Sequence, residues 1–264
     1  MEGRPRAQIT GLAGAPCTAL ASFAMQLYFI RHAQSTNNAL WAQSGHSNTR
    51  NEDPQLTEIG RQQAVILADF LSRGDPKGGG VCEPGSLDGF QITHLYTSLM
   101  VRAVETGLQI SRAIGLPPVA WEDVHEEGGI YLEDEQSQAR VGLPGKSRAY
   151  FQEHYPELVL PEEMNDSGWW NERPFEEVET RRRRAKRFLA DLLVRHGDTQ
   201  DRVAIVSHGG FYNLFIHTIL DRPARDGLWF TMYNAGISRL DIEEYGSSLV
   251  YHNRVDFLPG DLIT

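Results

Sequence analysis

The sequence predicts an α/β fold, a doubly wound and mostly parallel sheet with helices on both faces. Continuous apolar runs such as 27–30 and 203–206 have the length and composition of strands buried in a parallel sheet. Segments with apolar residues at helical spacing lie between such runs, and this alternation is typical of α/β folds. The chain has 264 residues, 41% of them hydrophobic, which is enough to bury a sizeable core.

The expected elements alternate along the chain in order. The first strand, 27–30, is Leu-Tyr-Phe-Ile, and the helix pattern from 178 to 195 is carried by apolar residues such as Phe188, Leu189 and Leu192. Two strands near the C-terminus are expected to complete one edge of the sheet. The full expectation is strand 27–30, helix 57–73, strand 92–97, helix 101–114, strand 118–121, helix 178–195, strand 203–206, helix 210–219, and strands 236–242 and 249–255.

Histidines follow two of the expected strands at the points where those strands end. Arg31 and His32 follow the first strand, and His208 follows the strand at 203–206. Arg102 lies about one turn beyond a third strand. Because ligands bind beyond the carboxyl ends of strands in open α/β sheets, we expect these four side chains to meet in one crevice. Such a cationic pocket suits a phosphoryl group, since Arg offers bidentate donors to its oxygens.

Two polar residues after His32 fit the same interpretation. Ser35 and Asn38 lie in the loop and first helical turn that follow, where backbone N–H groups and the helix dipole also favour an anion. The alternative is that both residues only cap the helix.

Four segments, taken in order, resemble motifs of the histidine phosphatase (phosphoglycerate mutase-like) superfamily. The first, 31–38, resembles Arg-His-Gly-x-Ser-x-x-Asn, with Ala33 where glycine is usual. The others are Asp53–Gly60 with Gln63-Ala64, Thr97-Ser98 with Arg102, Ala103 and Thr106, and Ser207-His208-Gly209-Gly210. The resemblance runs from Met25 to the C-terminus and points to the phosphatase branch. It implies a single catalytic domain at 25–264 with an inserted cap at 131–177, and an extension at 1–24 outside the core.

The resemblance also implies a reaction and the residues that perform it. A phosphomonoester would be hydrolysed through a phosphohistidine on His32, the nucleophile. Arg31, Arg102 and His208, with Ser35 and Asn38, would bind the phosphoryl oxygens. The expected substrate is a phosphorylated small molecule, and neither a metal ion nor a cofactor is expected to be required.

A carboxylic acid is needed to protonate the leaving oxygen and later to activate water. The segment 124–131 stands where the family places its acid, and Glu126 aligns best with it. Glu127 is the alternative, because adjacent side chains of an extended segment point to opposite faces.

Other functions stay open at this point. A phosphoglycerate mutase-type phosphotransferase shares the first step, but that branch follows its acid with Arg-His-Tyr-Gly, which this chain lacks at 127–130. A non-catalytic phospho-ligand binder is a third class. His32, His208 and Glu126 could instead form a metal triad, although the arginines would repel a divalent cation.

Two other arginine-containing segments receive structural interpretations. Arg195-His196-Gly197 has the family's Arg-His-Gly letters, but it ends a helical pattern, so we interpret it as a last turn and C-cap. The run 181–184 is interpreted as a solvated helix face.

By analogy with the family, the cap tunes substrate choice. Its candidates for substrate contact are Arg140, Lys146, Arg148, Trp169, Trp170 and Arg173. The alternative is that the two tryptophans pack the cap onto the core.

Composition limits the partners. The formal net charge of −10 implies neither a nucleic-acid partner nor an anionic membrane surface, and no run has transmembrane length. Cys17 and Cys82 give no disulfide framework, so we expect a reducing compartment, the cytoplasm. Residues 1–24, with few acids, are also compatible with an organelle-targeting segment. The oligomeric state is open, a homodimer being one option.

Overall fold

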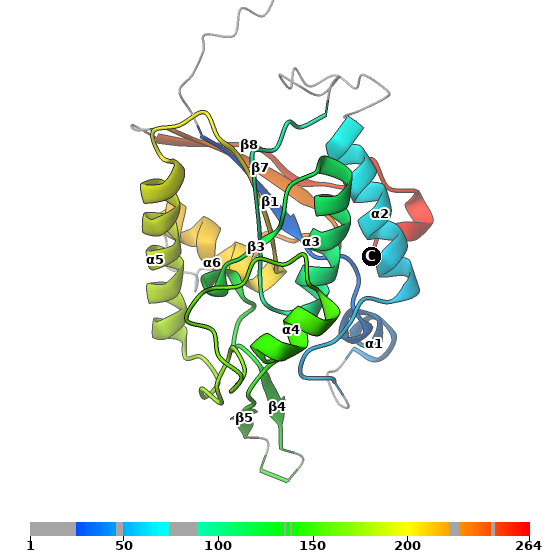
Figure 1. The fold of residues 1–264 in the computed structure, drawn as a ribbon, viewed down its shortest axis with the longest axis vertical. Coiled ribbons are helices and arrows are strands. Elements are labelled where there is room, and N and C mark those ends of the chain that lie inside the picture. Colours follow the sequence, from blue (N-terminus) through cyan, green and yellow to red (C-terminus); the bar gives the residue numbers. More distant parts are fainter. Residues whose placement is uncertain are drawn as a thin grey trace, which may run out of the picture.

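A six-stranded mixed sheet forms the centre of the molecule in a computed structural model of the chain (Figure 1). The structure describes residues 25–45, 50–73, 89–134, 136–137, 139–221, 227–243 and 246–264. The strand order is β3-β2-β6-β1-β7-β8. The first four strands in this order are parallel, whereas β7 and β8 pair antiparallel at one edge. The strands are β1 Met25–Arg31, β2 His94–Thr97, β3 Val119–Ala120, β6 Arg202–Ser207, β7 Ile237–Glu243 and β8 Gly246–Arg254.

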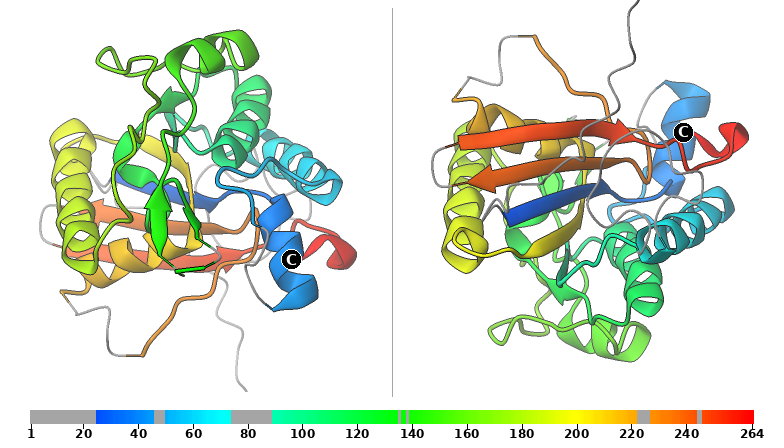
Figure 2. Two further views of the ribbon diagram at one scale, coloured as in Figure 1. Left: turned by 90° about the horizontal axis from the view of Figure 1, so that it is seen from below. Right: turned by 90° about the horizontal axis from the view of Figure 1, so that it is seen from above.

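Helices cover both faces of this sheet (Figure 2), as the doubly wound prediction requires. On one side lie α2 and α3, and on the other α5 and α6. The helices are α1 Thr36–Ser44, α2 Glu58–Arg73, α3 Val101–Ile114, α4 Arg148–His154, α5 Val178–His196 and α6 Gly209–Ile219, with short 3₁₀ turns at Glu122–Val124 and Gly260–Leu262.

The continuous apolar run of β1 has a direct structural reason. Successive side chains of a strand point to opposite faces. Leu27 and Phe29 therefore pack beneath α5 and α6, while Tyr28 and Ile30 pack beneath α2 and α3. A central strand with helices on both sides needs apolar residues at every position.

Aromatic side chains fill the layer between the sheet and α5 and α6. The ring of Phe188, on α5, lies 5.4 Å from the ring of Phe211 and 5.1 Å from that of Phe215, both on α6. The ring of Phe29 lies 6.0 Å from Phe215. All four side chains are fully buried.

The α/β/α prediction is confirmed, with element ends that differ by one to a few residues from the expected ranges. Not predicted were α4 and the two-stranded sheet of β4, Tyr131–Glu133, and β5, Arg140–Gly142. These elements are too short to show a hydrophobic period. Residues 1–24 and both cysteines lie outside the described residues, and the division into extension, domain and cap stays a prediction.

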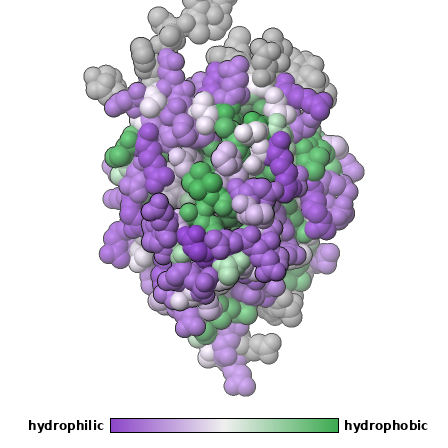
Figure 3. Space-filling model, in the orientation of Figure 1, coloured by the Kyte–Doolittle hydropathy of each residue, from purple (hydrophilic) through white to green (hydrophobic). Residues whose placement is uncertain are grey.

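Most of the face seen in Figure 3 is hydrophilic, with apolar side chains gathered near its centre. None of the described helices is both long and apolar enough to cross a membrane.

Phe188→Ala tests the contribution of the aromatic layer. We expect the free energy of unfolding to fall by about 3–5 kcal/mol, because the change leaves a cavity between α5, α6 and the sheet. Val194→Ala on the same helix is the control, since Val194 is 87% exposed and should change the value by less than about 0.5 kcal/mol. Equal effects in urea unfolding would contradict this account.

Candidate active site

The side chains that were expected to meet lie close together, at the carboxyl ends of the parallel strands. Neighbouring parallel strands β1, β6 and β2 end there, followed by His32, by His208 and by Arg102, the second residue of α3. A pocket of about 170 Å³ opens beside them. Its lining includes six of the seven predicted site residues, Arg31, His32, Ser35, Asn38, Arg102 and Glu126.

The seventh predicted residue, His208, lies behind the pocket. Its ring centroid is 5.1 Å from that of His32, and its side chain is fully buried. A larger hollow of about 690 Å³ runs between Trp121, Trp169 and the end of α5, but none of the predicted site residues lines it. The smaller pocket is therefore the candidate site, because the predicted charged residues line it.

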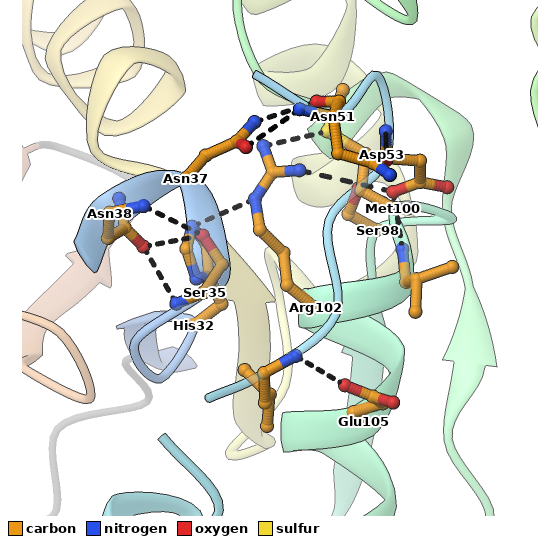
Figure 4. A network of polar contacts seen from close by, with 12 residues as sticks. His32, Ser35, Asn37, Asn38, Asn51, Asp53, Ser98, Met100, Arg102 and Glu105 are labelled. Carbon is orange, nitrogen blue, oxygen red and sulfur yellow. Dashed lines mark hydrogen bonds and ion pairs between the residues drawn. The ribbon is translucent and has the colours of Figure 1, made fainter. Parts of the chain in front are cut away.

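His32 is held in one orientation by its own loop. Its Nδ1 lies 2.7 Å from the carbonyl oxygen of Ala33, so we assign the ring proton to Nδ1. The other nitrogen, Nε2, then carries a lone pair and accepts a hydrogen bond of 3.1 Å from Nε of Arg102 (Figure 4). Burial, and then the charges of Arg102 and Arg31, hold the pKa of His32 well below its usual value.

Arg102 is buried and Arg31 is half-buried, and both have little charge compensation. Burial lowers the pKa of Arg31 and of Arg102. Nη1 of Arg31 donates to the carbonyl of Met232, but its Nε has no hydrogen-bond partner among the described residues. The carboxylate of Asp53 lies 4.0 Å from Nη1 of Arg102. Polar atoms buried in this way are usually paired, so an anion in the pocket would complete their contacts.

Asp53 was noted in the sequence only as part of a family segment. Its carboxylate accepts a 2.9 Å bond from the backbone of Val101, where α3 begins, and so fixes the start of the helix that carries Arg102 (Figure 4). Burial raises the pKa of Asp53 to about 6, against the opposing effect of Arg102.

His208 presents unpaired nitrogens toward the same region. It directly follows β6, whose last residue, Ser207, donates a 2.7 Å hydrogen bond to the carbonyl of Val124. Within the described part of the chain, neither ring nitrogen of His208 has a partner. Burial and the charge of Arg102 lower its pKa well below the usual value, so the imidazole is neutral and one N–H is free to bind an oxygen.

Glu126 lies against the N-terminus of α6. Its carboxylate accepts hydrogen bonds from the backbone N–H of Phe211 at 2.9 Å and of Gly210 at 3.3 Å. A Cβ at Gly210 would come within 2.4 Å of this carboxylate, so the close approach requires glycine there. Glu127 instead forms a 2.8 Å ion pair with Arg181 and does not line the pocket.

A buried ion pair holds the segment before Glu126. Arg184 on α5 binds Glu176 through two hydrogen bonds of 2.9 and 2.7 Å, and both side chains are buried. The same guanidinium donates to the carbonyls of Asp123 and His125. The interpretation of the basic run as a solvated face is therefore wrong for Arg184, because the run enters the core at its last position.

Ser35 and Asn38 form a capping box at the start of α1. Oγ of Ser35 accepts from the backbone of Asn38, and Oδ1 of Asn38 accepts from the backbone and hydroxyl of Ser35 (Figure 4). Asn234, which the sequence did not single out, donates to Oδ1 of Asn38 and to the carbonyl of His32. The capping alternative thus describes their present contacts, although both residues also line the pocket.

Arg50 is a pocket residue that the sequence reasoning missed. Its Nη1 donates a 2.6 Å hydrogen bond to the hydroxyl of Tyr131, and its guanidinium lies 4.3 Å from the centre of that ring. No motif marks an isolated arginine in a loop, so only the fold could reveal it. It adds a third guanidinium to the pocket wall.

The cap candidates have other contacts. Trp169 and Trp170 are buried against residues of α3 such as Val104, which is the packing alternative. Arg148 and Arg173 donate to backbone carbonyls within 144–177, and Arg140 lies over Phe175. None of the six candidates lines the described pocket.

His32, His208 and Glu126 do not bring three ligand atoms close enough together to share one ion. The site therefore offers cationic donors, a neutral imidazole and a carboxyl group rather than a cluster of metal ligands.

Comparisons with known proteins agree with this geometry. A sequence profile of the histidine phosphatase superfamily (branch 1) matches residues 27–78 and 84–255. The chain belongs to this superfamily. A curated relative of the histidine phosphatase, "Putative phosphoserine phosphatase 2" from Hydrogenobacter thermophilus, is 27% identical over 240 residues, covering 87% of this chain and 96% of the relative.

Solved structures share the histidine phosphatase fold. A mycobacterial glucosyl-3-phosphoglycerate phosphatase is 18% identical with a TM-score of 0.55, covering 88% of this chain and 100% of its own. A mutant phosphoserine phosphatase from Entamoeba histolytica, in complex with phosphoserine, is 19% identical with a TM-score of 0.54, covering 89% and 100%. At these identities the likeness establishes the fold.

The depressed pKa values of His32 and His208 have a measurable consequence. Burial and the adjacent guanidinium charges disfavour imidazolium, so both rings should stay neutral through the range around pH 6.5 in which an ordinary histidine titrates. In NMR titrations of the free protein, their imidazole shifts should be flat over this range. The signals are assigned with His32→Gln and His208→Gln, and a midpoint near 6.5 for either would contradict the burial argument.

Proposed function

We propose that this histidine phosphatase hydrolyses phosphomonoesters of small molecules through a phosphohistidine on His32. One observation carries the proposal: Nε2 of His32 holds its lone pair in a buried pocket, 3.1 Å from the Arg102 guanidinium. A neutral imidazole surrounded by cations is a nucleophile placed where a phosphate dianion binds.

In the first step, Nε2 of His32 attacks phosphorus in line with the ester oxygen. The N–P bond forms, the P–O bond breaks, and the carboxylic acid of Glu126 gives its proton to the leaving alcohol. Arg31, Arg102 and an N–H of His208 bind the other phosphoryl oxygens and offset the charge that shifts during transfer.

In the second step, the carboxylate of Glu126 takes a proton from water as the water attacks the phosphohistidine. The N–P bond breaks, inorganic phosphate forms and His32 regains its lone pair. The backbone N–H groups of Gly210 and Phe211 hold the Glu126 side chain by hydrogen bonds and so keep it at the pocket between the two steps.

Hydrolysis is favoured over transfer to a second substrate by the residues after Glu126. Glu127 is paired with Arg181, and Gly128 and Gly129 pack against Phe175 and Trp170. This stretch brings no cation to the pocket to hold a second anionic group. The relatives compared above, which carry phosphatase names, support the same choice.

Hydrolysis of p-nitrophenyl phosphate, with EDTA present, tests the proposal. Wild type should be active, and His32→Ala should lose at least about 10³-fold in kcat/KM, because the nucleophile is removed. His154→Ala, which changes an exposed side chain of α4, is the control and should match wild type. Equal activity of wild type and His32→Ala would overturn the role of His32, whereas an inactive wild type would favour the mutase or the binder.

Glu126→Gln and Glu127→Gln form a matched pair for the acid. We expect Glu126→Gln to lower kcat by about 10²–10⁴-fold, since the amide cannot transfer a proton. Glu127→Gln should keep kcat within a few-fold, because Glu127 faces Arg181. The loss should shrink for substrates with good leaving groups, and an effect confined to Glu127→Gln would reassign the acid.

A further inference from the structure

A second cluster of ionisable side chains lies at the amino ends of the parallel strands, at the other end of the sheet from the phosphate pocket. His94 begins β2, Asp201 directly precedes β6, and His196 is the last residue of α5. Because β2 and β6 are parallel, their first residues lie at the same end of the sheet, whereas Arg102 and His208 follow the opposite, carboxyl ends of these strands. In Figure 1 this is the upper part of the sheet, where α5 ends.

One potential ligand atom from each of these three residues lies within 4.8 Å of the other two. No other such group of three occurs in the part of the chain that the structure describes. Nδ1 of His196 is 2.8 Å from Oδ2 of Asp201, and Nδ1 of His94 is 3.8 Å from the same oxygen. Ligand atoms at ordinary zinc distances in a tetrahedron are about 3.3 Å apart, so small shifts would seat an ion among them.

The most buried ligand already has the support that metal-bound histidines show. Nε2 of His196 lies 3.1 Å from the hydroxyl of Tyr96, a buried residue of β2. In the metal-free protein Nδ1–H of His196 donates to Asp201, and Nε2 accepts from Tyr96. An ion at Nδ1 would displace that proton, and the Nε2–H tautomer would then donate to the Tyr96 hydroxyl. A hydrogen bond of this kind fixes the tautomer and the ring orientation of a metal ligand.

The placement of His94 distinguishes this cluster from a simple helix-end contact. The bond between His196 and Asp201 alone would secure the turn after α5. The ring of His94, 4.6 Å from that of His196, adds nothing to that bond, and two protonated imidazoles so close would repel. Nδ1 of His94 lies 2.9 Å from the hydroxyl of Thr93. A shared cation would replace this contact and the proton on Nδ1 of His196, and so use the Nδ1 lone pairs of both rings.

The neighbouring arginine side chains contact other groups. The guanidinium of Arg195 lies 4.1 Å from the centre of the Trp121 ring, and Nη1 of Arg202 donates to the carbonyl of Phe90. His94 and Asp201 keep 42% and 25% of their side chains exposed, whereas His196 keeps 4%. An ion could therefore enter from solvent and be held against a buried ring.

We propose that His94, His196 and Asp201 bind one first-row transition-metal ion of the zinc type. Two imidazoles and one carboxylate suit such an ion, and three protein ligands leave a position for water. The ion would fasten the end of α5 to the starts of β2 and β6. It would stabilise the fold and take no part in chemistry at His32.

Zinc binding by the metal-free full-length protein tests this site. Titration against a competing chromophoric chelator should show one zinc ion per chain, and the ion should raise the melting temperature. His94→Gln should weaken binding at least about tenfold and abolish the thermal shift. His154→Gln, which removes an exposed histidine elsewhere, is the matched control and should bind as wild type does.

Two further measurements separate this site from the phosphate pocket. Tyr96→Phe, which removes only the supporting hydroxyl, should weaken zinc about tenfold. Phosphatase activity of His94→Gln should equal that of wild type, and that equality also shows that the variant folds. Zinc that binds wild type and His94→Gln equally, or no zinc binding at all, would overturn the site whatever the fate of the phosphatase proposal.

Discussion

The burial of Arg102, together with the partial burial of Arg31, is the constraint on which the surrounding structure depends. A guanidinium removed from water loses strong solvation, and here the compensation is partial, through Asp53, Glu126 and the carbonyl of Met232. A phosphoryl group would supply the missing negative charge. The parallel strands, the capped helix α1 and the turn before α3 hold these cations in place before any substrate arrives.

The same burial suits His32 to the proposed role of nucleophile. In water an imidazole titrates near neutral pH, but next to two cations its protonated form is unfavourable. His32 therefore keeps a lone pair, and its bond to Ala33 assigns that pair to the nitrogen facing Arg102. One physical cause thus supports both parts of the proposal, the binding of an anion and the reaction with it.

The sequence could predict those site residues that follow from a rule of the fold class, but not those that depend on contacts between distant segments. His32, His208 and Arg102 could be grouped because parallel strands end at one edge, which is a rule of the fold class. The choice between Glu126 and Glu127 depends on which carboxylate meets α6 and which meets Arg181, contacts across more than fifty positions. Arg50 and the buried Arg184 belong to no local pattern, so only the packed chain reveals them.

Helix α5 is anchored at both ends by different means. Near its start, Arg184 joins Glu176 to the carbonyls that precede Glu126, in a buried ion pair whose loss would be costly. Its last residue, His196, belongs to the proposed metal cluster, about three turns from Arg184 and beyond the fully buried Phe188 and Leu192. Because the first anchor needs no ion, releasing the metal would leave only the hydrogen bond between His196 and Asp201 to hold the end of α5, while Glu126 stays in place. The physical separation of the anchors is why stability, and not phosphate chemistry, is the property that a metal at this edge would govern.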